Sequence, residues 1–69
     1  MKLSARNIIS GTIKEIKKGA TTSHVRLDIG GGNIITASIT NEAVDDLKLA
    51  VGQKASAVIK ASDVMIAID

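Results

Sequence analysis

The sequence predicts an all-β fold, a five-stranded barrel with one short helix between the third and fourth strands. Three observations lead to this prediction: β-branched residues dominate, several runs alternate apolar and polar residues, and short glycine-containing turns separate those runs. Alternation with a period of two is the pattern of a strand that buries one face. With 69 residues, the chain is long enough for one domain, so we expect residues 1–69 to form a single domain.

The first strand is expected from about Asn7 to Lys17, and Gly11 lies near the middle of this long, irregular run. Glycine inside a strand indicates a bulge or a sharp bend, which is how strands turn the corners of small barrels. The second strand is expected at Val25–Ile29, where apolar residues alternate with charged ones. A turn at Lys17–Gly19 precedes it.

The glycine-rich run Gly30–Asn33 joins the second strand to the alternating residues Ile35–Thr40. Because glycine adopts positive φ without steric cost, this run predicts a hairpin turn. The one helical candidate follows at Glu42–Leu47, with Thr40 or Asn41 able to cap its first turn. We therefore expect the third strand to lead directly into the helix.

Gly52 marks a turn into a fourth strand at Ala55–Lys60, and Val64–Ile68 is expected to form the fifth. The fifth run carries apolar residues on both faces, which indicates a strand covered on both sides. Five strands with a helix between the third and fourth are typical of an oligonucleotide/oligosaccharide-binding-like (OB-like) Greek-key barrel.

Composition limits how such a small barrel is stabilised. The chain has no cysteine and no Phe, Tyr or Trp, and 45% of its residues are apolar. Disulfides are excluded, and so are the side chains that usually bury the most surface. We therefore expect the core to be completed against copies of the same chain, as a homo-oligomer. No apolar run suits a membrane span or an export signal, so we expect a cytoplasmic protein with no membrane partner.

Catalysis is not expected, because the single histidine, His24, has no adjacent nucleophile and no cysteine with which to share a metal. Asp45 and Asp46 are neighbours on the expected helix, so their carboxylates point in different directions and form no acid–base pair. We expect no enzyme activity, no cofactor and no directly coordinated metal ion.

Nucleic-acid binding is the function most often associated with this strand order. Such sites stack bases on aromatic side chains and follow the backbone with a basic groove. The chain has no aromatic residue, and its net charge is only +2. We expect no nucleic-acid partner, but an OB-type nucleic-acid-binding or regulatory interaction module remains the alternative function.

Two polar segments near opposite ends of the chain, Ser4–Asn7 and Lys60–Asp63, have similar compositions. Each contains a cation, a hydroxyl and an alanine, and each adjoins the end of an expected strand. Strand ends meet at a barrel rim, where these groups would form a pocket suited to a tetrahedral oxyanion. The competing interpretation is that they are ordinary strand-end polar groups, with Lys60 paired to Asp63. The residues alone leave both interpretations open.

Specific runs of the sequence resemble a known family. Ser4-Ala5-Arg6-Asn7 before a strand, Gly19 after a lysine-rich turn, and Val58–Val64 resemble the molbindins. These are small Mop-type molybdate-binding proteins related to the transport-associated OB (TOBE) domains. The resemblance covers essentially the whole chain, including Leu47–Gly52.

The resemblance implies a homohexamer, built as a trimer of dimers, that holds molybdate or tungstate between subunits. It implies a principal site formed by Ser4, Ala5, Arg6, Lys60, Ala61 and Ser62, with Thr40 supplied by a partner chain. A second oxyanion site is expected near Lys18 and Gly19. The sequence holds neither an ATPase nor a helix-turn-helix region, so we expect a free-standing store or buffer of the anion.

Overall fold

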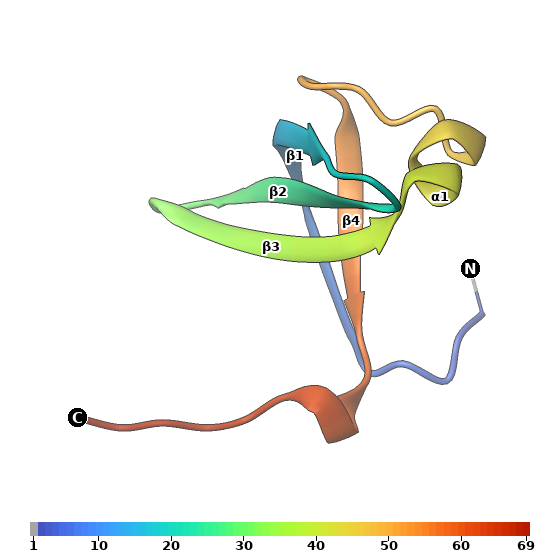
Figure 1. Ribbon diagram of the computed structural model, residues 1–69. Coiled ribbons are helices and arrows are strands. Elements are labelled where there is room, and N and C mark those ends of the chain that lie inside the picture. The colour runs from blue at the N-terminus through green and yellow to red at the C-terminus, as the bar shows by residue number, and fades with distance from the viewer. Residues whose placement is uncertain (1) are drawn as a thin grey trace.

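The computed structural model describes residues 2–69, which form one curled antiparallel sheet and one short helix (Figure 1). The elements are β1 (Asn7–Lys18), β2 (Thr22–Gly30), β3 (Asn33–Thr40), α1 (Asn41–Asp46), β4 (Lys54–Ile59) and the single 3-10 turn η1 (Ala61–Asp63). The strand order is β3-β2-β1-β4, and every neighbouring pair is antiparallel. Of the five predicted strands the first four form, and the predicted helix after the third is confirmed. Within the described residues, no helix has the length and apolar character needed to cross a bilayer.

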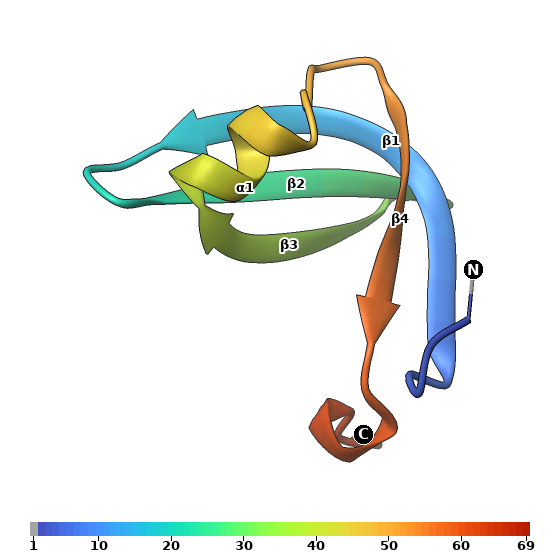
Figure 2. The same cartoon turned by 90° about the vertical axis from the view of Figure 1, so that its right-hand side faces the viewer.

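The bend in β1 allows one strand to pair with two neighbours along different parts of its length. Asn7–Thr12 pairs with β4, and Thr12–Lys18 pairs with β2. Figure 2 shows β1 curving through this change of partner. The register shift lies between Ile13 and Glu15, two residues beyond Gly11, so the extra residue of the bulge is not the glycine.

Gly11 has a different role, because it allows β1 and β2 to approach each other closely. A Cβ atom added at Gly11 would lie 2.5 Å from the carbonyl oxygen of Asp28 and 2.9 Å from Cγ of Leu27. Any larger residue would push the two strands apart at the point where β1 bends. Glycine is therefore needed for close packing at this corner of the barrel.

The predicted glycine turn is confirmed between β2 and β3. Gly30 pairs with Asn33, and the two residues between them, Gly31 and Gly32, have φ values of 62° and 78°. Positive φ at both central positions is the requirement of the common two-residue hairpin turn. The Asp28 carboxylate also accepts a hydrogen bond from the Gly30 N–H at 2.9 Å.

The core lies inside the curl of the sheet. Ile13 of β1, Val25 and Leu27 of β2, and Val44 of α1 are its buried residues. The helix begins at Asn41, one residue before the predicted start, and its cap is Thr40, whose hydroxyl accepts a hydrogen bond from the Ala43 N–H at 3.0 Å. α1 therefore covers one end of the half-barrel with Val44.

The fifth strand predicted at Val64–Ile68 does not form, and the five-stranded closed barrel is wrong for the single chain. After η1 the chain runs away from the sheet, and Met65, Ile66 and Ile68 are 92%, 88% and 93% exposed (Figure 1). Alternation indicates that a segment suits a strand, but a strand also needs a partner for its backbone hydrogen bonds. Here β3 and β4 remain the two edges of an open half-barrel.

Candidate functional site

The two polar segments leave the same end of the β1–β4 pair. Asn7 is paired with Ile59 at this end, and the Asn7 side-chain amide donates to the Ile59 carbonyl oxygen at 3.2 Å. Arg6 directly precedes this pair in the chain, and Lys60 directly follows it. Strand order and register thus bring together the end of the first segment and the beginning of the second, which are more than fifty residues apart in sequence. Beyond this point the segments diverge (Figure 1).

The polar groups of these segments are accessible. Ser4, Arg6, Lys60 and Ser62 are exposed, and Ala5 is half-buried. In η1 the amides of Asp63 and Val64 donate to the carbonyl oxygens of Lys60 and Ala61 at 2.9 and 3.3 Å. The first N–H groups of a helical turn have no partner within it, so the amides of Ala61 and Ser62 lie outside these bonds. Arg6 and Lys60 therefore supply cationic donors at this end of the sheet, and the hydroxyl and amide donors lie on the two segments that diverge from it.

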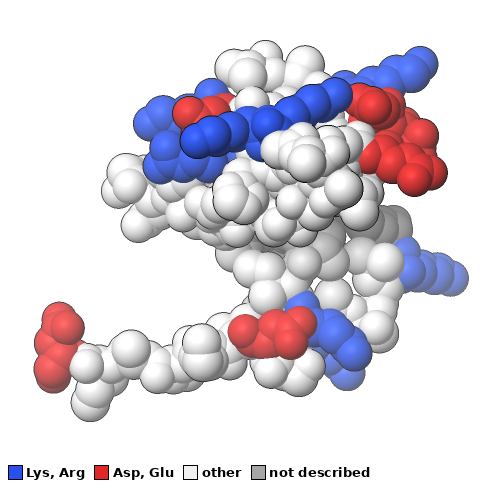
Figure 3. All heavy atoms as spheres, viewed as in Figure 1, with Lys and Arg blue, Asp and Glu red and all other residues white. Residues whose placement is uncertain are grey.

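The competing interpretation paired Lys60 with Asp63, but the described residues contain no such ion pair. The ion pairs in residues 2–69 are Lys18–Asp45 at 3.0 Å and Arg26–Glu15 at 3.8 Å. Figure 3 shows acidic side chains gathered over α1, at the other end of the half-barrel. The charges of Arg6 and Lys60 are therefore not neutralised by a salt bridge within this part of the chain.

Thr40 lies at the far end of the sheet from this pair of segments. It is the last residue of β3 and pairs with Thr22, close to the turn that follows β1. Its hydroxyl oxygen accepts from the Ala43 N–H, which leaves the hydroxyl hydrogen available for donation. Within one chain Thr40 does not reach Arg6 and Lys60, so any joint site requires a second copy.

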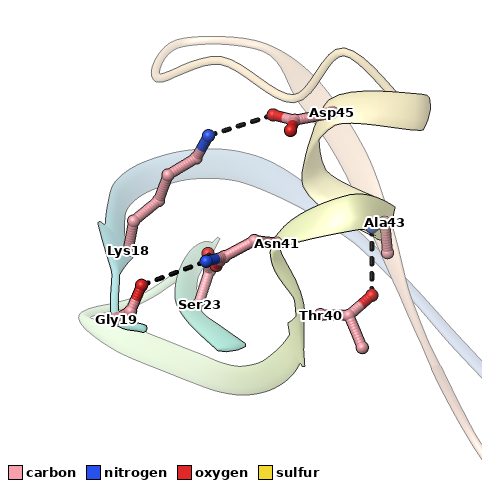
Figure 4. A network of polar contacts seen from close by, with 7 residues as sticks. All are labelled: Lys18, Gly19, Ser23, Thr40, Asn41, Ala43 and Asp45. Atoms are coloured by element: carbon pink, nitrogen blue, oxygen red, sulfur yellow. Dashed lines mark hydrogen bonds and ion pairs between the residues drawn. The ribbon is translucent and has the colours of Figure 1, made fainter. Parts of the chain in front are cut away.

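Lys18 and Gly19, predicted to mark a second oxyanion site, lie in a polar network beside α1 (Figure 4). The Lys18 ammonium contacts the Asp45 carboxylate at 3.0 Å, and the Gly19 N–H donates to the Thr22 carbonyl oxygen at 2.7 Å. Lys18 and Gly19, with neighbouring residues that include His24, line a small hollow of about 210 Å³. Both expected donors already have intramolecular partners, and the second site stays a prediction.

Asn41 is a structural residue whose role the sequence did not indicate. Its side-chain amide donates to the Gly19 carbonyl oxygen at 3.0 Å, and its side-chain oxygen accepts from the Ser23 hydroxyl (Figure 4). Ser23 is fully buried. Asn41 therefore ties the turn after β1 to the start of α1, while Thr40 caps the helix. The sequence feature that could have indicated this role is Ser23, a polar residue on the same inward-facing side of β2 as Val25 and Leu27.

The described residues contain no group of three or more His, Asp or Glu side chains placed to hold a metal ion. The arrangement at the Arg6–Lys60 end instead consists of donors and positive charge, which suits an anion.

Comparison with known proteins connects this geometry to a family. The model of the TOBE domain family matches residues 3–66. A protein from Haemophilus influenzae, named a probable molybdenum-pterin-binding protein, is 42% identical over the full length of both chains. Molybdenum-pterin-binding protein 1 of Clostridium pasteurianum is 46% identical over 96% of this chain and 97% of its own. The molybdenum transport protein ModE of Herbaspirillum seropedicae is 53% identical over 96% of this chain, which spans only 24% of that longer protein.

Solved structures of similar proteins have the same fold as this chain. A molybdate-binding protein from Sporomusa ovata superimposes with a TM-score of 0.92 at 37% identity, covering 99% of this chain and all of that one. MopII from Clostridium pasteurianum superimposes with a TM-score of 0.89 at 42% identity, and the match covers 97% of this chain and all of MopII. The cytoplasmic molybdate-binding protein ModG, solved with molybdate bound, superimposes with a TM-score of 0.89 at 52% identity. The match covers 94% of this chain and 46% of the ModG chain.

Proposed function

This chain belongs to the TOBE domain family and, within it, to the small Mop-type proteins, and from that premise we propose that it binds molybdate between copies of itself. Tungstate, which has a similar shape and charge, is expected to bind comparably. The observation that supports the proposal is the Asn7–Ile59 pairing, because it sets Arg6 and Lys60 beside each other at one end of the sheet. The molybdate-binding protein from Sporomusa ovata shares this fold over its whole length.

The proposed site combines charged donors with neutral ones. Arg6 and Lys60 supply charge-assisted hydrogen bonds, and the hydroxyls of Ser4 and Ser62 donate to further oxygens of the anion. Backbone amides near Ala5 and Ala61 complete the donor set on this chain. Thr40 is contributed by a partner chain, since it lies at the opposite end of its own sheet.

Ion selectivity in such a site depends on size and protonation. Sulfate carries the same charge as molybdate, so cavity size and donor placement must separate the two. Phosphate keeps a proton near neutrality, and a site built only of donors offers that proton no acceptor. We therefore expect molybdate to bind more tightly than either competitor.

The proposed assembly is a hexamer, a trimer of dimers, with the anion held between subunits. A dianion between Arg6 and Lys60 side chains offsets their mutual repulsion. Because molybdate would bind the assembly and not separated chains, it should also stabilise the oligomer by mass action. Native mass spectrometry with and without molybdate tests this, since a hexamer has six times the 7.1 kDa chain mass plus the mass of each bound ion.

We further propose that the protein is a cytoplasmic store or buffer of the oxyanion and that it carries out no reaction. Reversible binding by exposed donors is sufficient for that role. Among the compared proteins, ModG is described as a cytoplasmic molybdate-binding protein.

Isothermal titration calorimetry with Arg6→Ala and Lys60→Ala tests the site residues. A hydrogen bond to a charged group contributes roughly 1.5–3 kcal/mol, which corresponds to a roughly 10- to 150-fold rise in Kd. Lys54→Ala is the matched control, because Lys54 begins the same strand that Lys60 follows. It should leave molybdate affinity unchanged. Wild-type affinity in both Arg6→Ala and Lys60→Ala would show that the anion binds elsewhere.

A further inference from the structure

The pair formed by Asn7 and Ile59 is the last one in the β1–β4 ladder. β1 begins at Asn7 and β4 ends at Ile59, and within residues 2–69 the pairing of these two strands does not continue past them. Arg6 and Lys60 are the residues that directly flank this pair. The separation of their backbones therefore depends on whether this one pair is closed or open.

Chain geometry shows how far the pair limits that separation. Facing Cα atoms of an antiparallel pair lie roughly 4.5–5.5 Å apart, and consecutive Cα atoms lie about 3.8 Å apart. With the Asn7–Ile59 pair closed, the Cα atoms of Arg6 and Lys60 are therefore at most roughly 13 Å apart. If the pair opens, Ile8 and Val58 become the last pair, and this limit rises to roughly 21 Å. Opening thus leaves the two cationic groups free to separate.

Little apolar burial holds the two strands together at this end. The last three pairs join Asn7–Ile9 to Ala57–Ile59, and none of these six residues is buried. Ile8 and Val58, which face each other, are 48% and 46% exposed. Strand ends with few buried contacts open at a low cost in free energy. A single additional contact at the last pair therefore strongly affects how often it opens.

The Asn7 side chain supplies such a contact. Its amide Nδ2 donates to the carbonyl oxygen of Ile59 at 3.2 Å, and this bond joins residues 52 positions apart. It adds to the backbone pairing of the same two residues. Asparagine is depleted in strands, so intrinsic strand propensity does not explain its place at the start of β1. The cross-strand hydrogen bond does.

We propose that Asn7 is a positioning residue of the anion site, which fastens the last pair of the β1–β4 ladder and thereby holds Arg6 and Lys60 beside each other. This inference rests on the molybdate site proposed above. Asn7 acts through the backbone and does not need to touch the anion. A closed pair sets the two cations in place before the anion arrives, so less ordering is required on binding.

The expected effect is smaller than the loss of a charged donor. A neutral intramolecular hydrogen bond changes an equilibrium constant by roughly 2- to 12-fold. If molybdate binds only when the Asn7–Ile59 pair is closed, loss of the side-chain bond raises Kd by up to this factor. The factor expected for Arg6→Ala is roughly 10- to 150-fold. The size of the effect therefore separates a positioning residue from a donor to the anion.

Asn7→Leu tests the fastening, because leucine has nearly the shape of asparagine but donates no hydrogen bond. Asn33→Leu is the matched control, since the Asn33 amide also donates to a backbone carbonyl oxygen, that of Gly30 at 3.3 Å, in the hairpin outside the proposed site. Amide hydrogen exchange is measured without molybdate. We expect faster exchange at residues 7–9 and 57–59 in Asn7→Leu and wild-type exchange there in Asn33→Leu. Wild-type exchange in Asn7→Leu would overturn the proposal.

Calorimetric titration with molybdate separates positioning from general destabilisation. We expect Kd to rise roughly 2- to 12-fold for Asn7→Leu and to keep its wild-type value for Asn33→Leu. Asn7→Gln retains an amide donor and should bind more tightly than Asn7→Leu. In the double variant Arg6→Ala/Asn7→Leu, the further rise in Kd should be smaller than in the wild-type background, because one of the two positioned cations is already absent.

The outcomes distinguish this inference from the proposed function. A wild-type protein that binds no molybdate would refute the proposed function and the positioning role with it. If the wild type binds and Arg6→Ala weakens binding, an unchanged Kd in Asn7→Leu overturns the positioning role alone. An equal rise in Kd on adding Asn7→Leu to both backgrounds would also overturn it, since a purely structural defect does not depend on Arg6.

Discussion

Replacing Gly11 with alanine tests the close approach of β1 and β2 at the bend in β1, on which the strand arrangement depends. The added Cβ would lie 2.5 Å from the Asp28 carbonyl oxygen and 2.9 Å from Leu27 Cγ. The Asp28 carbonyl oxygen belongs to the backbone of the adjacent strand, so no side-chain rotation can relieve this contact. β1 and β2 must separate, and Leu27 of the core must move with them.

The size of the effect follows from two opposing contributions. Overpacking of a well-packed interior costs about 1–3 kcal/mol, and a backbone contact this short belongs to the upper part of that range. Alanine also restricts the unfolded chain, which offsets about 0.4–1 kcal/mol. The net loss of about 1–2.5 kcal/mol corresponds to a fall in Tm of roughly 4–20 °C for a domain of this size.

The assay is thermal unfolding followed by far-UV circular dichroism, with both proteins at one concentration because an oligomer's Tm depends on it. Gly32→Asn is the control, since a Cβ at Gly32 has no neighbour within 4 Å and asparagine tolerates positive φ. The control should change Tm little. A Gly11→Ala protein as stable as the wild type would refute the close approach of β1 and β2.

Three further substitutions test the elements beside the sheet. Thr40→Ala removes the helix cap and should lower the unfolding free energy by about 1 kcal/mol in urea titration, whereas Thr40→Ser should retain it. Asn41→Ala leaves the buried Ser23 hydroxyl without its acceptor and should cost about 1–3 kcal/mol by the same measurement; a neutral result would show that water replaces the amide. Lys18→Ala should cost less than about 1 kcal/mol, because the side chains of Lys18 and Asp45 are 52% and 67% exposed. A larger loss of unfolding free energy for Lys18→Ala would indicate that the oligomer shields this ion pair from solvent.

Local patterns in the sequence predicted most of the fold. The hairpin at Gly30–Asn33 followed from the conformational freedom of glycine, and the position of the helix followed from the two possible capping residues, Thr40 and Asn41, of which Thr40 is the cap. Alternation located the second, third and fourth strands because each of them turns one face toward the core. These features depend on neighbours in sequence, which is why residue patterns reveal them.

Features that depend on distant partners were not predictable in the same way. The register shift between Ile13 and Glu15 depends on how β1 divides its pairing between β2 and β4. The bond from Asn41 to Gly19 joins residues 22 positions apart. Val64–Ile68 has the pattern of a strand, but whether it pairs depends on which edge is available to it.

The candidate site was predictable in outline from strand order. The meeting of strand ends suggested that Ser4–Arg6 and Lys60–Ser62 share one end of the sheet. The Asn7–Ile59 pair brings Arg6 and Lys60, which flank it, to that end. Sequence reasoning did not identify Asn7 as the residue that ties the two strands at this point. The placement of Thr40 at the opposite end requires that a joint site span two chains.

The most direct test of the account is a crystal structure of the protein grown with molybdate, with the metal located by its anomalous scattering. We predict molybdenum peaks between copies of the chain, within hydrogen-bonding reach of Arg6 and Lys60. Peaks remote from both residues, or crystals without bound molybdate at saturating concentration, would contradict it.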